Sequence, residues 1–266
     1  MDLSRPVVMG VLNVTPDSFS DGGRFADTDA AVRHGLILAE EGAAFIDVGG
    51  ESTRPGAAAV GVEEELRRVI PVIERLHGAA AAVICVDTSK PEVMRAAARA
   101  GAGLINDVRA LREAGALEAA GLSGCAVCLM HMQGEPRTMQ LAPAYEDVVS
   151  EVRAFLAQRA EACRAAGFAA DRLTVDPGFG FGKTLEHNLR LLRRLRELSQ
   201  DGLPVTVGLS RKSMVGKLTG RPEGGRLLGS VVLGVMAALE GARIVRSHDV
   251  AATVEALRVV AAVRES

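Results

Sequence analysis

The chain repeats one pattern along most of its length: a short apolar run ends in a polar residue, and a stretch rich in alanine, leucine, glutamate and arginine follows. The pattern occurs eight times, and its polar positions are Asn13, Glu51, Asp87, Asn106, His131, Asp176, Ser210 and Arg246. The apolar runs are continuous and not alternating, as in strands that are covered on both faces. Eight such strands, each followed by a helix, predict an α/β fold that is a single (β/α)8 TIM barrel, with the active site at the carboxyl ends of the strands.

The stretches between the apolar runs have the composition of helices, and several stop at a glycine. We predict helices over Ala30 to Glu41, Glu92 to Ala100, Val148 to Ala166 and Leu227 to Glu240. The spacing of Ser89 and Glu92 predicts a capping box at the start of the second helix, which leaves Asp87 free to bind a ligand.

Length and composition favour one domain over residues 1–266, because 266 residues suit one barrel and no linker rich in proline, glycine and serine divides the chain. A net charge of −2, one tyrosine and no tryptophan argue against a nucleic-acid surface. The N-terminus lacks the apolar core of a signal peptide, and the longest apolar run, near Val231 to Leu239, is too short to span a bilayer. We therefore expect a cytoplasmic protein with small-molecule partners, no nucleic-acid partner and no membrane partner.

The four cysteines do not form a recognisable metal site. Cys125 and Cys128 lie three apart in an apolar run, so in a strand they point to opposite faces and cannot bind one metal together. Cys85 and Cys163 stand alone. We predict that all four are small buried hydrophobic residues.

The segment LTVDPGFGFGK, from Leu173 to Lys183, joins a strand, a carboxylate and a glycine loop. Asp176 comes at the carboxyl end of the strand, and Pro177 stops the strand because it has no N–H to donate. The three glycines that alternate with Phe179 and Phe181 permit positive φ and the close approach of a flat ligand. This segment therefore predicts a ligand-binding loop.

Three other interpretations of the segment are weaker. A phosphate-binding P-loop needs a glycine where Pro177 stands, and a dinucleotide fingerprint needs a different glycine spacing and a downstream acid. A plain turn, with Asp176 capping a helix, is disfavoured because Thr184 is a better cap for the helix whose apolar stripe is Leu185, Leu189 and Leu192.

The polar residues at the strand ends divide into two chemical groups. Asp87, Asn106 and Asp176 offer acceptors, which suit the N–H edge of a heterocycle. The cations near the same rim are Arg54, Lys212, Arg246 and His248. Several cations at one rim indicate a phosphate or pyrophosphate, with arginine for bidentate contacts and lysine as a point charge.

At this point the chain closely resembles the dihydropteroate synthases, which belong to the pterin-binding enzymes. The resemblance rests on NVTPDSFSDGG (13–23), GGESTRPG (49–56), VDTSK (86–90), IND (105–107), LMHMQG (129–134), DPGFGFGK (176–183), GLSRKS (208–213) and RSHDV (246–250). These motifs span nearly the whole chain in one order. Ser247 and Arg109 are mild departures beside otherwise matching residues.

The resemblance implies a transferase of folate biosynthesis. Its reaction condenses 4-aminobenzoate with 6-hydroxymethyl-7,8-dihydropterin pyrophosphate, and the products are 7,8-dihydropteroate and pyrophosphate. It also implies Mg²⁺ as cofactor, sulfonamides as inhibitors and a homodimer, for which the apolar stretch Val231 to Leu239 is a candidate surface.

The resemblance further implies a role for each matching residue. The pterin contacts would be Asp87, Asn106, Met130, Asp176, Phe181 and Lys212, and the pyrophosphate contacts Asn13, Arg54, Arg246 and His248. The aminobenzoate pocket would be Phe19, Thr53, Pro55 and Ser213, and the residues closest to the chemistry Asp21, Asp87 and Lys212. Asn13 would also approach a Mg²⁺ ion that the pyrophosphate largely holds. His131 is expected either to contact the ligand or to support the site.

No catalytic nucleophile is expected, because loss of pyrophosphate leaves a methylene cation that is conjugated with an electron-rich ring. Ser210 and Ser213 are interpreted as hydrogen-bond donors and not as nucleophiles, since no GxSxG elbow surrounds them. Two other functions are considered. A pterin-dependent methyltransferase would have less use for the segments 13–23 and 49–56, and a non-catalytic paralogue would have lost residues that this chain retains.

Overall fold

Eight parallel strands close into a barrel in chain order, and β8 pairs with β1. The computed structural model describes residues 2–15, 23–52, 59–135, 138–199 and 202–265. The strands are β1 (Val7–Asn13), β2 (Phe45–Gly49), β3 (Val83–Asp87), β4 (Leu104–Asp107), β5 (Ala126–Met130), β6 (Leu173–Asp176), β7 (Val205–Gly208) and β8 (Ala242–Ser247). The prediction of a (β/α)8 TIM barrel is confirmed.

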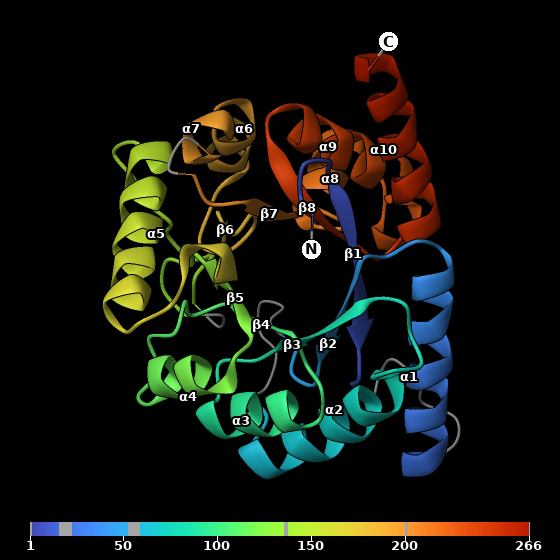
Figure 1. Cartoon of the computed structure of the whole chain (residues 1–266). Helices are drawn as coiled ribbons and strands as arrows, with labels where there is room; N and C mark the ends of the chain where they lie inside the picture. Colours follow the sequence, from blue (N-terminus) through green and yellow to red (C-terminus); the bar gives the residue numbers. More distant parts are fainter. Residues whose placement is uncertain (1, 16–22, 53–58, 136–137, 200–201, 266) are drawn as a thin grey trace.

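The helices lie outside the strands and surround the barrel (Figure 1). They are α1 (Gly23–Glu40), α2 (Val62–Leu76), α3 (Pro91–Arg99), α4 (Ala116–Ser123), α5 (Val148–Ala165), α6 (Leu185–Arg193), α7 (Arg196–Ser199), α8 (Ser213–Thr219), α9 (Leu227–Leu239) and α10 (Val250–Glu265), with short 3-10 turns η2 (Ala170–Arg172) and η3 (Glu223–Gly225). The predicted ends of α1, α3, α5 and α9 are confirmed to within one residue. The predicted start of α1 is wrong, since this helix begins at Gly23 and not at Ala30. Within the described ranges no helix is long and apolar enough to cross a membrane.

Apolar side chains form two separate cores and a smaller cluster at the mouth of the barrel. A large core lies between the strands and the helices. A small core inside the barrel consists of Met9, Phe45, Cys85, Leu104, Cys128 and Ile244. Cys125 belongs to the outer core and Cys128 to the inner one, and all four cysteines are free and buried, as predicted.

The inner core explains why polar side chains point into the barrel. Residues two apart in a strand share a face, so the residue two positions after an inward apolar residue also points inward, closer to the carboxyl end. The pairs are Phe45 with Asp47, Cys85 with Asp87, Leu104 with Asn106, Cys128 with Met130, and Ile244 with Arg246. The apolar floor is therefore followed by a mostly polar layer at the mouth of the barrel.

The helix starts differ in part from the sequence-based expectation. Thr184 caps α6 as predicted, because its hydroxyl accepts from the backbone N–H of His187, but Leu189 of the predicted stripe is exposed. The predicted capping box of Ser89 and Glu92 is wrong. The N-cap of α3 is Lys90, without a side-chain cap, and the Ser89 hydroxyl instead donates to Oδ1 of Asp107, at the end of the neighbouring strand β4.

Candidate active site

The loop after β6 fixes Asp176 at the mouth of the barrel. Asp176 is buried, and its Oδ1 accepts from the backbone N–H of Gly178 at 2.7 Å. Gly178 and Gly182 have φ of 67° and 61°, and an added Cβ would lie 1.9 Å from the carbonyl oxygen of His131 or 2.3 Å from that of Gln133. No other residue type fits at these two positions, so the loop can lie this close to the chain after β5.

Lys183 fixes the same loop through hydrogen bonds to its backbone carbonyl groups. Its Nζ is buried and donates to the carbonyl oxygens of Gly178 and Phe181, both at 3.0 Å, and it lies 2.9 Å from Nδ1 of His131. Burial, followed by the charge of Lys183, lowers the pKa of His131 to about 3, which keeps the imidazole neutral. The His131 ring also packs edge-on against Phe155 at 4.9 Å. The structure therefore gives His131 a supporting position behind the loop.

Arg246 lies between two carboxylates, the buried Asp47 and the mostly buried Asp87. Its Nε donates to Oδ2 of Asp47 at 2.6 Å, and its Nη2 donates to Oδ2 of Asp87 at 3.1 Å. Asn106 donates through Nδ2 to the same Asp47 oxygen at 3.0 Å. The sequence-predicted residues Asp87, Asn106 and Arg246 therefore meet around Asp47, a residue that the sequence analysis did not single out.

The surroundings of Asp87 change its acidity. Burial, and then the nearby Asp47 carboxylate, raise the pKa of Asp87 to about 8, while Arg246 acts in the opposite direction. Burial likewise raises the pKa of Asp176, against the effect of Lys212. Two acids with raised pKa values at one strand-end layer are typical of a functional site.

Lys212 follows β7, the strand next to the one that ends in Asp176. Its Nζ donates to the carbonyl oxygen of Phe179 and lies 4.6 Å from the ring centroid of Phe181. Burial lowers the pKa of Lys212 to about 8, although the charge of Asp176 raises it. A Cβ at Gly208 would lie 3.7 Å from Lys212 Nζ and 3.9 Å from Arg246 Cδ, so both cations approach the end of β7.

An apolar wall completes the mouth. Met130 is buried and belongs to a cluster that also contains Val108, Met132 and Met139. Phe181 is partly buried and packs on this cluster. Met130 and Phe181 thus lie together beside Asp176 and Lys212, as a face on which a flat ring can stack.

The remaining described residues lie at the rim. Nδ1 of His248 is 3.0 Å from Oγ of Ser210, and the exposed Ser213 begins α8 directly after Lys212. Asn13 ends β1, and a Cβ at Gly49 would lie 3.8 Å from both Asn13 Oδ1 and Asp87 Oδ2. Phe19, Asp21, Thr53, Arg54 and Pro55, which the sequence analysis assigned to the site, lie outside the described residues.

The donor set at the mouth limits how a metal could be held. Among the described residues there is no group of three or more histidine, cysteine, aspartate or glutamate side chains that could bind a metal ion. Asn13 offers one amide oxygen next to Asp87. A single oxygen fits an ion such as Mg²⁺ that takes its other ligands from phosphate oxygens and water.

Two further residues were missed by the sequence analysis. Asp47 stands inside the apolar run FIDVGG, and an unexplained acid in a strand covered on both faces was the available signal. Lys183 was counted only as part of a motif, and its burial could not be read from its neighbours.

Taken together, the mouth presents carboxylates, one apolar face and cations within a single layer of the barrel. This arrangement suits a flat ring with an N–H edge that carries an anionic group. The cysteine thiols are buried, and burial raises their pKa values, so they are not activated nucleophiles. Oγ of Ser210 accepts from the backbone N–H of His248 at 3.1 Å and lies 3.0 Å from Nδ1 of the same residue.

Comparisons with known proteins agree with this geometry. A family model described as "Pterin binding enzyme" matches residues 9–248. The dihydropteroate synthase of Escherichia coli strain K12 is 56% identical over 262 residues, which cover 98% of this chain and 93% of that protein. A Xanthomonas albilineans dihydropteroate synthase with 4-aminobenzoic acid superposes with a TM-score of 0.95 at 57% identity, covering 100% of this chain and 96% of that one. The Yersinia pestis dihydropteroate synthase in a sulfonamide drug complex also has a TM-score of 0.95, at 54% identity, covering 100% and 97% of the two chains. The chain therefore belongs to the family of pterin-binding enzymes.

Proposed function

We propose that this protein is a dihydropteroate synthase, which joins 4-aminobenzoate to 6-hydroxymethyl-7,8-dihydropterin pyrophosphate and releases pyrophosphate. The observation that carries the proposal is the layer of Asp87, Asn106 and Asp176 beside Lys212 and Arg246, in a chain 56% identical to a dihydropteroate synthase. Its transferase chemistry belongs to folate biosynthesis.

We infer that the pterin ring lies between the acids and the apolar wall. Asp87 and Asp176 would accept from its N–H groups, Asn106 would contact its edge, and Met130 and Phe181 would pack on its plane. Lys212 would contact the ring's oxygen and N5. A carboxylate that hydrogen-bonds to the ring also stabilises the positive charge that the ring gains in the reaction.

The proposed chemistry needs no covalent enzyme intermediate. The C–O bond between the pterin methylene group and pyrophosphate breaks, and its electron pair leaves on the phosphate oxygen. The amine nitrogen of aminobenzoate then forms the C–N bond and loses a proton to solvent. Arg246, His248 and Arg54 would hold the leaving anion, and Asp21 would help assemble the reacting complex.

The metal and the second substrate complete the proposal. Mg²⁺ would neutralise the pyrophosphate charge, with Asn13 as its contact on the protein. Phe19, Thr53, Pro55 and Ser213 would form the aminobenzoate pocket. Sulfonamides share the aniline nitrogen of aminobenzoate, so inhibition kinetics should be competitive with aminobenzoate and not with the pterin.

We also propose that two copies of the chain associate through α9. Leu228, Val232 and Met236 lie on one face of this helix at i, i+4 and i+8, and they are 74%, 48% and 47% exposed. Light scattering should show a dimer, and Leu228→Glu with Met236→Glu should give a monomer.

We further propose that the protein works in the cytoplasm, because its substrates are small molecules and its four buried free thiols suit a reducing compartment.

An assay of pyrophosphate release tests the proposed function. Release should require the pterin pyrophosphate and aminobenzoate together. Release with the pterin substrate alone would indicate a hydrolase, and methyl transfer from a pterin would indicate the methyltransferase. Pterin binding with no product under any condition would indicate a non-catalytic paralogue.

A further inference from the structure

Two side-chain contacts join the loops that follow β7 and β8. The strand β7 ends at Gly208, and the first contact comes two residues later, where Oγ of Ser210 accepts from the backbone N–H of His248 at 3.1 Å. The second contact is one residue further along each loop. Nε of Arg211 donates to Oδ2 of Asp249 at 3.1 Å, and Nη2 donates to Oδ1 at 2.5 Å. The two neighbouring strands therefore stay connected through side chains after the sheet has ended.

The backbone of Arg211 is fixed independently of its guanidinium group. Its φ is 57°, in the left-handed region that a residue with a side chain adopts at a cost. Its backbone N–H donates to Oγ of Ser230 in α9 at 2.9 Å, and its carbonyl oxygen accepts from Nη1 of Arg226, the N-cap of α9, at 2.9 Å. Replacing the side chain of Arg211 should therefore break the pair with Asp249 and leave the turn in place.

Asp249 is the fixed partner at the other end of the ion pair. It lies directly before α10, and its carbonyl oxygen accepts from the backbone N–H of Thr253 at 3.1 Å. Its own backbone N–H donates to Oγ of Ser247, the last residue of β8, at 3.2 Å. The carboxylate that receives Arg211 is thus held by both the strand before it and the helix after it.

The two loops carry contacts for different parts of one substrate. Lys212, directly after Arg211, is assigned to the pterin ring, and its Nζ donates to the carbonyl oxygen of Phe179 in the glycine loop. His248, directly before Asp249, is assigned to pyrophosphate. In the pterin substrate a single methylene group joins the ring to the pyrophosphate, so both contacts must be made at one fixed separation.

We propose that Arg211 is a positioning residue for the pterin substrate, and this inference rests on the proposed synthase function. By pairing with Asp249, Arg211 sets the separation between Lys212 and His248. Arg211 itself touches neither the ring nor the pyrophosphate. When one end of a two-part ligand is bound, the other end binds with a high effective concentration only if the two subsites keep the matching distance. Loss of the pair should therefore weaken the intact substrate and spare its two parts.

Calorimetry with three probes tests this proposal. The probes are 6-hydroxymethyl-7,8-dihydropterin pyrophosphate, the same pterin alcohol without pyrophosphate, and inorganic pyrophosphate, each in the presence of Mg²⁺ and without aminobenzoate. In Arg211→Met we expect the affinity for the intact substrate to fall about tenfold, a size typical of coupling between neighbouring elements, and that for each part to change less than about twofold. KM for the pterin substrate should rise with the loss of affinity, and KM for aminobenzoate should stay at its wild-type level.

The variants separate positioning from stability. The side chain of Arg211 is 42% exposed, and pairs of this kind contribute little to stability, so Arg211→Met should remain folded. Arg211→Met with Asp249→Asn removes the unpaired carboxylate as well, and it should lose no more affinity for the intact substrate than Arg211→Met alone, because both changes break one pair. Arg194→Met, which breaks a pair of similar exposure with Asp147 at the start of α5, is the matched control and should leave all three affinities unchanged.

The proposal is overturned if folded Arg211→Met binds the intact substrate as tightly as the wild type does. It is also overturned if inorganic pyrophosphate or the pterin alcohol alone is weakened as much as the intact substrate, because Arg211 would then contact that part directly. Losses that add in the double variant would likewise overturn it. A wild-type protein that makes no dihydropteroate would instead refute the proposed function, and that result is distinct from every outcome in the variants.

Discussion

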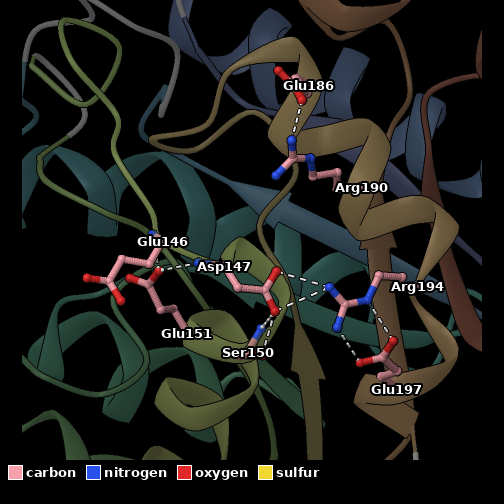
Figure 2. A network of polar contacts seen from close by, with 8 residues as sticks. All are labelled: Glu146, Asp147, Ser150, Glu151, Glu186, Arg190, Arg194 and Glu197. Carbon is pink, nitrogen blue, oxygen red and sulfur yellow. Dashed lines mark hydrogen bonds and ion pairs between the residues drawn. The ribbon is translucent and has the colours of Figure 1, made fainter.

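Arg194 and Arg246 each lie between two carboxylates, and their surroundings differ. On the surface, Arg194 bonds to Asp147 at 3.0 Å and to Glu197 at 2.7 Å, as Figure 2 shows, with side chains about 40% exposed. In the mouth of the barrel, Arg246 bonds to Asp47 at 2.6 Å and to Asp87 at 3.1 Å, with these carboxylates 0% and 11% exposed.

The comparison shows that geometry alone does not set the role of an ion pair. Water surrounds the network of Arg194 and screens its charges, so such pairs contribute little to stability. The carboxylates around Arg246 have lost their water, and a buried pair of this kind is seldom a gain over apolar packing. Two acids and an arginine at this position are therefore better explained by a role in binding than by a contribution to stability.

The largest expected effect is that of Arg246→Met, which breaks the buried network. It leaves the buried Asp47 without its cation, and Asp87 as well at a pH at which that acid is ionised, and we expect the free energy of unfolding to fall by about 3–5 kcal/mol. Denaturant titration measures this change. Synthase activity should be lost in protein that remains folded, because the proposed pyrophosphate contact is gone.

A second variant tests whether uncompensated charge causes the loss of stability in Arg246→Met. Arg246→Met combined with Asp47→Asn and Asp87→Asn removes the uncompensated charges, so stability should return while activity does not. If Arg246→Met were as stable as the wild type, the buried network would be no more important for the fold than the exposed one.

The next effect concerns Asp176→Asn, which changes the mouth without touching the network of Arg246. The amide oxygen can still accept from the N–H of Gly178, so the loop should keep its shape. The amide nitrogen would face the N–H groups of the ring, and we expect pterin binding to weaken by about 1–3 kcal/mol. Calorimetry measures it, and Asp147→Asn on the surface is the matched control. Equal pterin affinity in Asp176→Asn and wild type would contradict the assignment.

The strand ends, and with them most of the mouth, were predictable from the sequence. Continuous apolar runs gave the strands, and the polar residue after each run marked the edge at which parallel strands meet. Asp87, Asn106, Asp176 and Arg246 were found in this way, because a side chain at a strand end needs no information about distant partners to be placed. The positive φ of the glycines after Asp176 was likewise expected from local sequence.

The partners of these residues were not predictable, because they lie far apart in the sequence. Asp47 and Arg246 are 199 positions apart, and no local periodicity reports such a contact. Ser89 illustrates the same limit. The local pattern predicted that its side chain would cap α3, but its hydroxyl donates to the carboxylate of Asp107, which is 18 positions away in the sequence. The sequence thus predicts which residues reach the mouth, and the closure of the barrel decides which of them pair.

The third prediction concerns pH, because the pKa of a carboxyl group is shifted in opposite directions in the two regions. Burial raises the pKa of Asp87 to about 8, whereas the hydrogen bond from Ser150 lowers the pKa of the exposed Asp147. Below about pH 8, Asp87 in the free enzyme is protonated and loses acceptor capacity. Above about pH 8, Lys212 loses its charge, because burial lowers its pKa to about 8.

We therefore expect kcat/KM for the pterin substrate to follow a narrow bell with its maximum near pH 8, falling about tenfold per pH unit on each side. The alkaline limb should disappear in Lys212→Arg, because arginine keeps its charge, while the acid limb remains. A profile that is flat between pH 6 and about 10 would show that neither group titrates in the working range.

The smallest effect is expected for Arg194→Met, the surface counterpart of Arg246→Met. Asp147 caps α5 through the backbone N–H of Ser150 at 3.4 Å, and this contact does not involve Arg194 (Figure 2). Both carboxylates around Arg194 can be solvated when the guanidinium is removed, so neither is left buried and uncompensated. We expect the midpoint of denaturant unfolding to stay within the error of the measurement, and both KM values to stay at their wild-type levels. Raising the salt concentration should reduce any remaining difference from the wild type, because exposed pairs are screened. A loss of stability comparable to that of Arg246→Met would mean that exposure does not separate the two arginines.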